Sequence, residues 1–225
     1  MTITIGNIEI EVQRKRIKNI HLHVKPDNRV FITAPLHTSL SVIKKIAEDN
    51  INWINKSLEK YKEMPKKPES RLETGEKLYV FGNEYTLMLV PGNGSSFYLS
   101  EDKAVLIMKP DSSIEERRRA VDNAMRELLS DKVSQLFPKW EKITGLKANE
   151  WHIKSMKTRW GSCNPSAKRI WLSLQLAEKP EICIEYVILH ELVHFWFSNH
   201  GSDFKARMDE FMPDWREIRV KLNNR

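Results

Sequence analysis

The residues best suited to chemistry in this sequence lie close together near its C-terminal end. His190, Glu191 and His194 form the pattern H-E-x-x-H, and His200 follows after a short interval. On a helix, His190 and His194 lie one turn apart on the same face, where two imidazoles can bind one zinc ion. Glu191 can then act as general base on a metal-bound water. Because a catalytic zinc uses three protein ligands and one open position, His200 is the candidate third ligand.

A chance occurrence of the motif is the alternative interpretation, and the surrounding residues argue against it. The helix that would carry the motif is otherwise strongly apolar, with Ile182, Ile184, Val187, Ile188, Leu189, Leu192, Val193 and Phe195. Charged and imidazole groups are costly to bury unless they are paired or bound to a metal. We therefore favour a metal site over a structural accident, and a catalytic Glu191 over a surface charge.

The spacing also predicts where this helix ends. In an unbroken helix, His200 would lie about 9 Å further along and about 240° around from His194, out of reach of the same metal. The helix must therefore end soon after His194, and Ser198, Asn199 and Gly201 are residue types that allow the chain to turn. The histidine spacing equals that of the metzincin pattern, but Phe197 occupies the position of its glycine, which argues against a true metzincin.

The hydrophobic pattern along the chain predicts a mixture of strands and helices. Apolar residues that alternate with polar ones indicate hairpins in residues 2–12, 20–32 and 77–109. Helical spacing follows a possible cap at Ser39, and a long helix to Thr144 begins near Ser113, with Pro138 kinking or interrupting it. Further expected segments are a charged connector over 62–76, strands at 151–154 and 169–174, and helices at 202–211 and 213–221.

The overall composition is that of a globular protein. The 225 residues are 40% hydrophobic and 30% charged, which is enough for one large domain or two small ones. Cys163 and Cys183 are too few for a disulfide scaffold, exclude a zinc site made of cysteines, and suggest a reducing compartment. No apolar run reaches membrane-spanning length, and the N-terminus does not resemble a signal peptide. We therefore expect a cytoplasmic protein with no membrane partner.

The net charge of +7 favours anionic partners only mildly, because basic residues are common on solvated surfaces. Two local clusters are more specific, namely Arg14, Lys15, Arg16 and Lys18, and then Lys154, Lys157, Arg159, Lys168 and Arg169. The first cluster is predicted at the start of the strand that opens the second hairpin. It could form the binding face of a nucleic-acid-associated protein, although no specific reader motif is present.

The sequence resembles the YgjP-like metal-dependent hydrolases, also described as YgjP-like metallopeptidases, over nearly the full chain and most specifically over about residues 150–217. The resemblance rests on residues 157–163 (KTRWGSC), Pro180, the HELVH motif, Asn199-His200, Phe204, and residues 212–215 (MPDW). It implies a zincin-like fold, in which His190, His194 and His200 bind the metal and Glu191 is the general base. Ser173 departs from the family pattern, in which an asparagine is expected.

Together with the resemblance, the pattern predicts an α+β fold. Residues 1–110 would form a β-rich N-terminal region with hairpins and a helix over 39–61. Residues 111–225 would form a zincin-like, helical metal-binding catalytic domain with a small sheet. The alternative is one continuous domain.

Three further residues are candidates for contact with substrate or for support of the ligands. Arg159 could hold an oxyanion or a substrate phosphate, or could form an ion pair within the domain. Asp203 could orient a ligand histidine or cap a helix, and Asn199 lies beside His200 in the expected turn.

The leading functional hypothesis is a hydrolase with one Zn²⁺ per chain, most simply a metallopeptidase acting on peptides. The first alternative is a metal-dependent hydrolase of anionic small molecules such as nucleoside triphosphates. It is suggested by the basic clusters and by Arg159, although no phosphate-binding loop is present. The second alternative is the nucleic-acid-associated protein described above.

Overall fold

The computed structural model describes residues 1–25, 27–63, 70–156 and 158–224. By their contacts the residues form two compact units, Met1–Glu69 and Ser70–Arg225, which are described separately here. The central part of the predicted connector, residues 64–69, and Lys157 of the second basic cluster lie outside the described residues. The division predicted after residue 110 falls inside the second unit, and as a statement about independently folding domains it stays a prediction.

The first unit is a four-stranded sheet with two helices. Its strand order is β1-β2-β4-β3, with β1 (Thr2–Ile5), β2 (Ile8–Lys15), β3 (His21–Val24) and β4 (Val30–Pro35). The pairs β1–β2 and β3–β4 are antiparallel, which confirms both predicted hairpins, and β2 pairs with β4 in parallel. Alternate residues of β2, such as Ile10 and Val12, are buried in the core of this unit. The first turn contains Gly6 at φ +58°, a backbone conformation that glycine adopts without steric cost.

The helix predicted over residues 39–61 is wrong in one respect, because the structure has two helices there. These are α1 (Leu40–Asp49) and α2 (Ile51–Glu63), and Ser39 caps α1 as expected by accepting a hydrogen bond from the Val42 amide. Asn50 separates them with φ −107° and ψ 13°, and its side-chain amide donates to the Ile46 carbonyl at 2.8 Å. Asparagine competes with helical backbone bonds through its own side chain, which explains the break.

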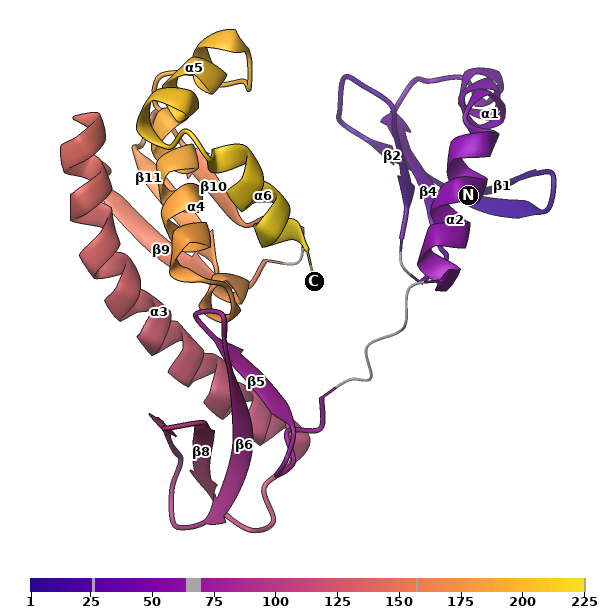
Figure 1. The fold of residues 1–225 in the computed structure, drawn as a ribbon. Coiled ribbons are helices and arrows are strands. Elements are labelled where there is room, and N and C mark those ends of the chain that lie inside the picture. The colour runs from indigo at the N-terminus through magenta and orange to yellow at the C-terminus, as the bar shows by residue number, and fades with distance from the viewer. Residues whose placement is uncertain (26, 64–69, 157, 225) are drawn as a thin grey trace. The chain divides into compact units, whose positions relative to one another are not determined.

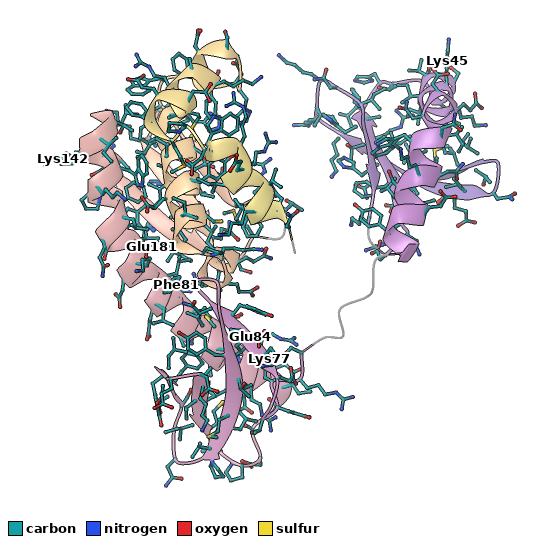
Figure 2. The ribbon with its side chains drawn as sticks, in the orientation of Figure 1. Lys45, Lys77, Phe81, Glu84, Lys142 and Glu181 are labelled. Carbon is teal, nitrogen blue, oxygen red and sulfur yellow. The ribbon has the colours of Figure 1, made fainter. Side chains whose placement is uncertain are left out.

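The second unit begins with another four-stranded sheet. Its order is β5-β6-β8-β7, with β5 (Lys77–Val80), β6 (Asn83–Pro91), β7 (Ser96–Ser100) and β8 (Lys103–Met108). Antiparallel β5–β6 and β7–β8 are the hairpins that the alternating pattern predicts. Lys77 and Glu84 form an exposed salt bridge of 2.7 Å across β5 and β6 (Figure 2). In the turn between these strands, the Phe81 amide donates to the Ala177 carbonyl, which joins this sheet to the C-terminal part of the unit.

The long helix α3 (Ile114–Thr144) has clear signals at both ends. Ser113 and Glu116 form a reciprocal capping box at its start, and Gly145 ends it in the left-handed region at φ +71°. Pro138 lies inside the helix and does not interrupt it. The buried residues of α3 recur at helical spacing from Val121 to Thr144, so one face packs on the core.

The remaining elements form a small sheet and the helices that carry the site. The sheet has the order β10-β11-β9, with β9 (Glu150–Lys154), β10 (Gly161–Asn164) and β11 (Arg169–Ser173). A short 3-10 helix, η1 (Leu174–Glu178), leads to α4 (Glu181–Val193), α5 (Ser202–Phe211) and α6 (Trp215–Asn223). Figure 1 shows α4 in the middle of this part, between α3 and α6. At its start, Glu181 forms an ion pair with Lys132 of α3 at 2.7 Å (Figure 2).

This architecture confirms the predicted α+β class, with β-rich regions followed by helices and a small three-stranded sheet. Strands at 150–154 and 169–173 and the helix at 202–211 lie where the sequence pattern places them. Among the described helices, none combines the length and apolar character needed to cross a membrane.

Candidate metal centre

Helix α4 fixes the positions of His190 and Glu191. It is apolar on all sides, and ten of its thirteen residues are buried. It contacts α3, α5, α6, β10 and β11, so it forms the centre of the core instead of covering one face of it. His190 and Glu191 lie in its last turn, where core packing on every side holds the helix backbone in place.

The helix that carries the motif ends where the spacing of the histidines requires it to end, at His194. Helix α4 ends at Val193, and His194 is its C-terminal capping residue. Turn hydrogen bonds follow, including those from the Phe195 amide to Leu192 and from the Trp196 amide to Val193. The chain then reverses into α5. These turns bring His200 back to the end of α4, as the metal hypothesis requires.

The three histidines converge on one point. Their candidate ligand atoms all lie within 4.8 Å of one another, and the Nε2 atoms of His190 and His200 are 3.1 Å apart. His194 places its Nδ1 2.9 Å from the Phe197 carbonyl oxygen, which accepts a hydrogen bond and leaves Nε2 of His194 free for a metal. The buried Phe204 ring contacts all three imidazoles, with ring centroids 4.8 to 5.0 Å apart.

The electrostatic environment keeps two of these imidazoles neutral. Burial lowers the pKa of His190 to about 3, and the charges of His194, His200 and Arg219 contribute in the same direction. Burial and neighbouring positive groups also lower the pKa of His200. A neutral imidazole is the form that binds metal, so these residues suit a cation at neutral pH. His190 Nδ1 is buried without a hydrogen-bond partner among the described residues.

Glu191 lies beside the cluster in a tightly packed position. Its side chain is 5% exposed, and burial raises its pKa to about 8, an effect that the positive charge of Arg159 opposes. Strand β10 passes so close that a Cβ atom at Gly161 would lie 2.6 Å from Glu191 Oε1 and 2.8 Å from Val187 Cγ1. Any larger residue at position 161 would force the Glu191 and Val187 side chains, or the strand itself, to move.

A cleft of about 760 Å³ opens over the histidines and Glu191. One side comes from residues 158–163 and Pro165, and the other comes from α5 and α6, including Lys205, Trp215 and Arg219. Cys163 also lines the cleft, and burial raises the pKa of its thiol to about 12, so the thiol stays protonated at neutral pH. The histidines are the candidate ligands because their ring nitrogens converge, and three imidazoles with an adjacent carboxyl group fit a divalent metal of the zinc type.

Comparison with known families agrees with this geometry. The family described as "YgjP-like, metallopeptidase domain" matches residues 18–225. The chain belongs to this YgjP-like family. Its members are grouped as metallopeptidases, which fits a metal-dependent hydrolase with the histidine cluster as the metal site. No curated protein was similar enough to count as a match.

Two solved structures show partial similarity to this YgjP-like chain. The metallopeptidase zymogen abylysin of Pyrococcus abyssi is 23% identical, and the alignment covers 39% of this chain and 90% of that one, with a TM-score of 0.36. The metallopeptidase zymogen jannalysin of Methanocaldococcus jannaschii is 25% identical, with coverage of 40% and 87% and a TM-score of 0.36.

The other predicted site residues lie in different places. Arg159 is exposed and lines the cleft. Asn199 accepts a hydrogen bond from the Gly201 amide at 3.0 Å and shapes the turn. Asp203 lies in the first turn of α5 and contacts Ser202; among the described residues it makes no hydrogen bond with a ligand histidine. Roles in catalysis for these three residues stay predictions.

The roles of four residues of the site were not predicted from the sequence. Gly161 and Phe204 belong to the segments that carry the family resemblance, but no local pattern reveals their packing against Glu191 or the histidines. Tyr186 lies one turn before His190 on α4, with its ring 5.7 Å from that imidazole, so helical spacing could have suggested it. Arg219 comes from a distant helix, and only the tertiary structure brings it to the cleft.

The predicted location of the first basic cluster is wrong. Arg14 and Lys15 end β2 and do not begin the strand of the second hairpin, which starts at His21. The Arg14 guanidinium donates hydrogen bonds to the carbonyls of Leu36 at 3.0 Å and Thr38 at 2.6 Å. Arg14 therefore holds the loop before α1, which weakens its use as a contact for nucleic acid.

Proposed function

We propose that this protein is a zinc-dependent peptidase in which His190, His194 and His200 bind one Zn²⁺ and Glu191 is the general base. The observation that carries the proposal is the convergence of three imidazoles beside a buried carboxyl group in an open cleft. When bound, zinc supplies a water of lowered pKa and polarises the carbonyl to be attacked. The unpaired cysteines fit the proposed cytoplasmic location.

Glu191 performs the proton transfers in this proposal. Without a metal its pKa is about 8, and a divalent cation beside it favours the carboxylate form by Coulomb attraction. As a carboxylate, Glu191 takes a proton from the attacking water and then delivers it to the amine leaving group. Close packing against Gly161 of β10 restricts the orientation of the Glu191 carboxyl group, which lines the cleft.

Nucleoside triphosphate hydrolysis is a second candidate, favoured by the exposed Arg159 in the cleft. Arginine binds phosphate oxygens through two parallel hydrogen bonds. The same metal and Glu191 would serve this reaction, so the two candidates differ in substrate and not in site.

One experiment tests both candidates. The zinc-loaded full chain is incubated with a fluorogenic peptide library and, separately, with common nucleoside triphosphates. Peptide hydrolysis that disappears in Glu191→Gln and His200→Ala supports the peptidase, and triphosphate hydrolysis with the same losses supports the alternative. Glu127→Gln is the control, because Glu127 is an exposed residue on α3, and this variant should keep full activity. Turnover that is unchanged in Glu191→Gln would contradict both.

A further inference from the structure

The charges that line the cleft are strongly unbalanced. Arg159, Lys205 and Arg219 are cationic, and Glu191 is the acidic residue among the lining side chains. All three cationic side chains are exposed, and within the described parts of the chain none of them forms an ion pair. A divalent metal on the histidines would add further positive charge.

Two arginines near these residues in the sequence do have acidic partners. Arg216, one turn before Arg219 on the same helix, forms a bidentate ion pair with Asp209 and stacks over Trp215. Arg169, ten residues after Arg159 at the start of β11, is paired with Glu150. Arg216 and Arg169 are therefore neutralised within the fold, whereas Arg159 and Arg219 line the cleft without an ion pair to any described residue and can bind an anionic group that enters it.

The three cations come from different elements, with Arg159 on one side of the cleft and Lys205 and Arg219 on the other. Arg159 precedes β10, and its charge acts on Glu191. Arg219 projects from α6, and its charge acts on Tyr186, His190 and His200. Lys205 belongs to α5. Cations that surround the reactive centre from different sides suit an extended ligand with separate negative groups better than one compact phosphate cluster.

Apolar surface lies next to these charges. Trp160, Phe204, Trp215 and Leu222 all line the cleft, and the indole of Trp160 is held by a hydrogen bond to Asn223 at 3.1 Å. Such a surface can bury parts of a peptide while the arginines bind carboxylates through charge-assisted hydrogen bonds. Because the three cationic side chains are exposed, dissolved salt screens their attraction for a carboxylate.

We propose that this cleft selects acidic peptides, with Arg159 and Arg219 binding aspartate or glutamate side chains on either side of the scissile bond. The inference rests on the proposed peptidase function and assigns its substrate class. Lys205 adds to the positive potential near His200. Neutral and basic peptides gain no such contacts, and basic peptides are repelled.

The first test measures binding, which is independent of turnover. Labelled peptides that differ only by Glu or Asp against Gln or Asn are titrated into Glu191→Gln full chain, both zinc-loaded and after chelation. Acidic peptides should bind about tenfold more tightly than their amide partners, equivalent to about 1.4 kcal/mol. The preference should shrink as salt is raised, because ions screen the arginines.

The variants Arg159→Gln and Arg219→Gln should each remove most of this preference. Lys142→Gln is the matched control, because Lys142 is exposed on α3 and does not line the cleft (Figure 2). Circular dichroism and the melting temperature show whether each variant is folded. Equal binding of acidic and amide peptides, or a preference that survives in both arginine variants, would overturn the inference.

The second test separates this inference from the proposed function. Zinc-loaded wild type is given the same peptide pairs, and hydrolysis is followed. Cleavage of acidic and amide peptides at equal rates supports the peptidase and overturns the selectivity. Selective binding without cleavage of any peptide supports the selectivity and counts against the peptidase. The inference would also be overturned if a nucleoside triphosphate bound through Arg159 and Arg219 while acidic and amide peptides bound equally well.

Discussion

The buried carboxyl group of Glu191 should make the stability of the metal-free protein depend on pH. Burial raises the pKa of Glu191 from 4.5 to about 8. Because the folded state binds this proton more tightly than the unfolded chain, the stabilisation is complete below pH 4.5 and is lost as the pH rises through 8. At about 1.36 kcal/mol for each pKa unit, the full effect is about 5 kcal/mol, of which about 3.5 kcal/mol falls between pH 5 and pH 8.

Urea unfolding of the chelator-treated protein at pH 5 and pH 8 measures this effect. Tryptophan fluorescence is a suitable probe, because six of the seven tryptophans belong to the second unit. Glu191→Gln removes the titrating group and nearly preserves its size. Over this range the wild type should lose about 3.5 kcal/mol more free energy of unfolding than the variant. Glu127→Gln, which changes an exposed carboxyl group on α3, should behave like the wild type.

His190 acts in the opposite direction and does not affect this comparison. Its pKa falls from 6.5 to about 3, so its contribution is present above pH 6.5 and is lost as the pH falls. It is present in the wild type and in both variants, and therefore cancels. If Glu191→Gln loses as much stability between pH 5 and pH 8 as the wild type, the reasoning about the buried carboxyl group is refuted.

Three further predictions concern metal binding, the packing of Gly161 against Glu191, and the N-terminal cap of α3. Zinc at 100 times its Kd should raise the free energy of unfolding by about 2.7 kcal/mol, and His200→Ala should remove most of that gain in calorimetry. Gly161→Ala should cost about 1–3 kcal/mol, because its Cβ would overlap Glu191; an unchanged melting temperature would contradict the tight packing. Ser113→Ala should cost about 1 kcal/mol in urea unfolding, because the capping box is lost.

Local sequence signals predicted the parts of the site that depend on neighbours in the chain. The spacing of His190 and His194 places both side chains on one face of the helix. If His200 is to reach the same metal, the helix must end soon after His194. Ser113 and Gly145 are local signals of the same kind, and both helix ends lie where they indicate. Such features follow from backbone geometry over a few residues.

The remaining features depend on packing between distant segments. Strand β10 was not predicted, because its four residues have no clear alternation and its position depends on pairing with β11. The close approach of Gly161 to Glu191 follows from that pairing, and Arg219 reaches the cleft only because α6 packs on α4. At Asn50 a local interaction was missed. The apolar spacing predicted one continuous helix, but the hydrogen bond from the Asn50 side chain to the Ile46 carbonyl interrupts it.

The burial of α4 gives the candidate metal site a fixed framework, although the site opens into a surface cleft. Two candidate ligands come from a helix end whose backbone is fixed by the core, and the third comes from a turn. That turn would be the weak point, but α5 begins at Ser202, two residues after His200, and is anchored by the buried residues Phe204 and Met208. Phe204 also supports all three imidazoles. The same ring therefore ties the ligand from the turn to the two from the helix, which reduces the conformational entropy lost when a metal binds.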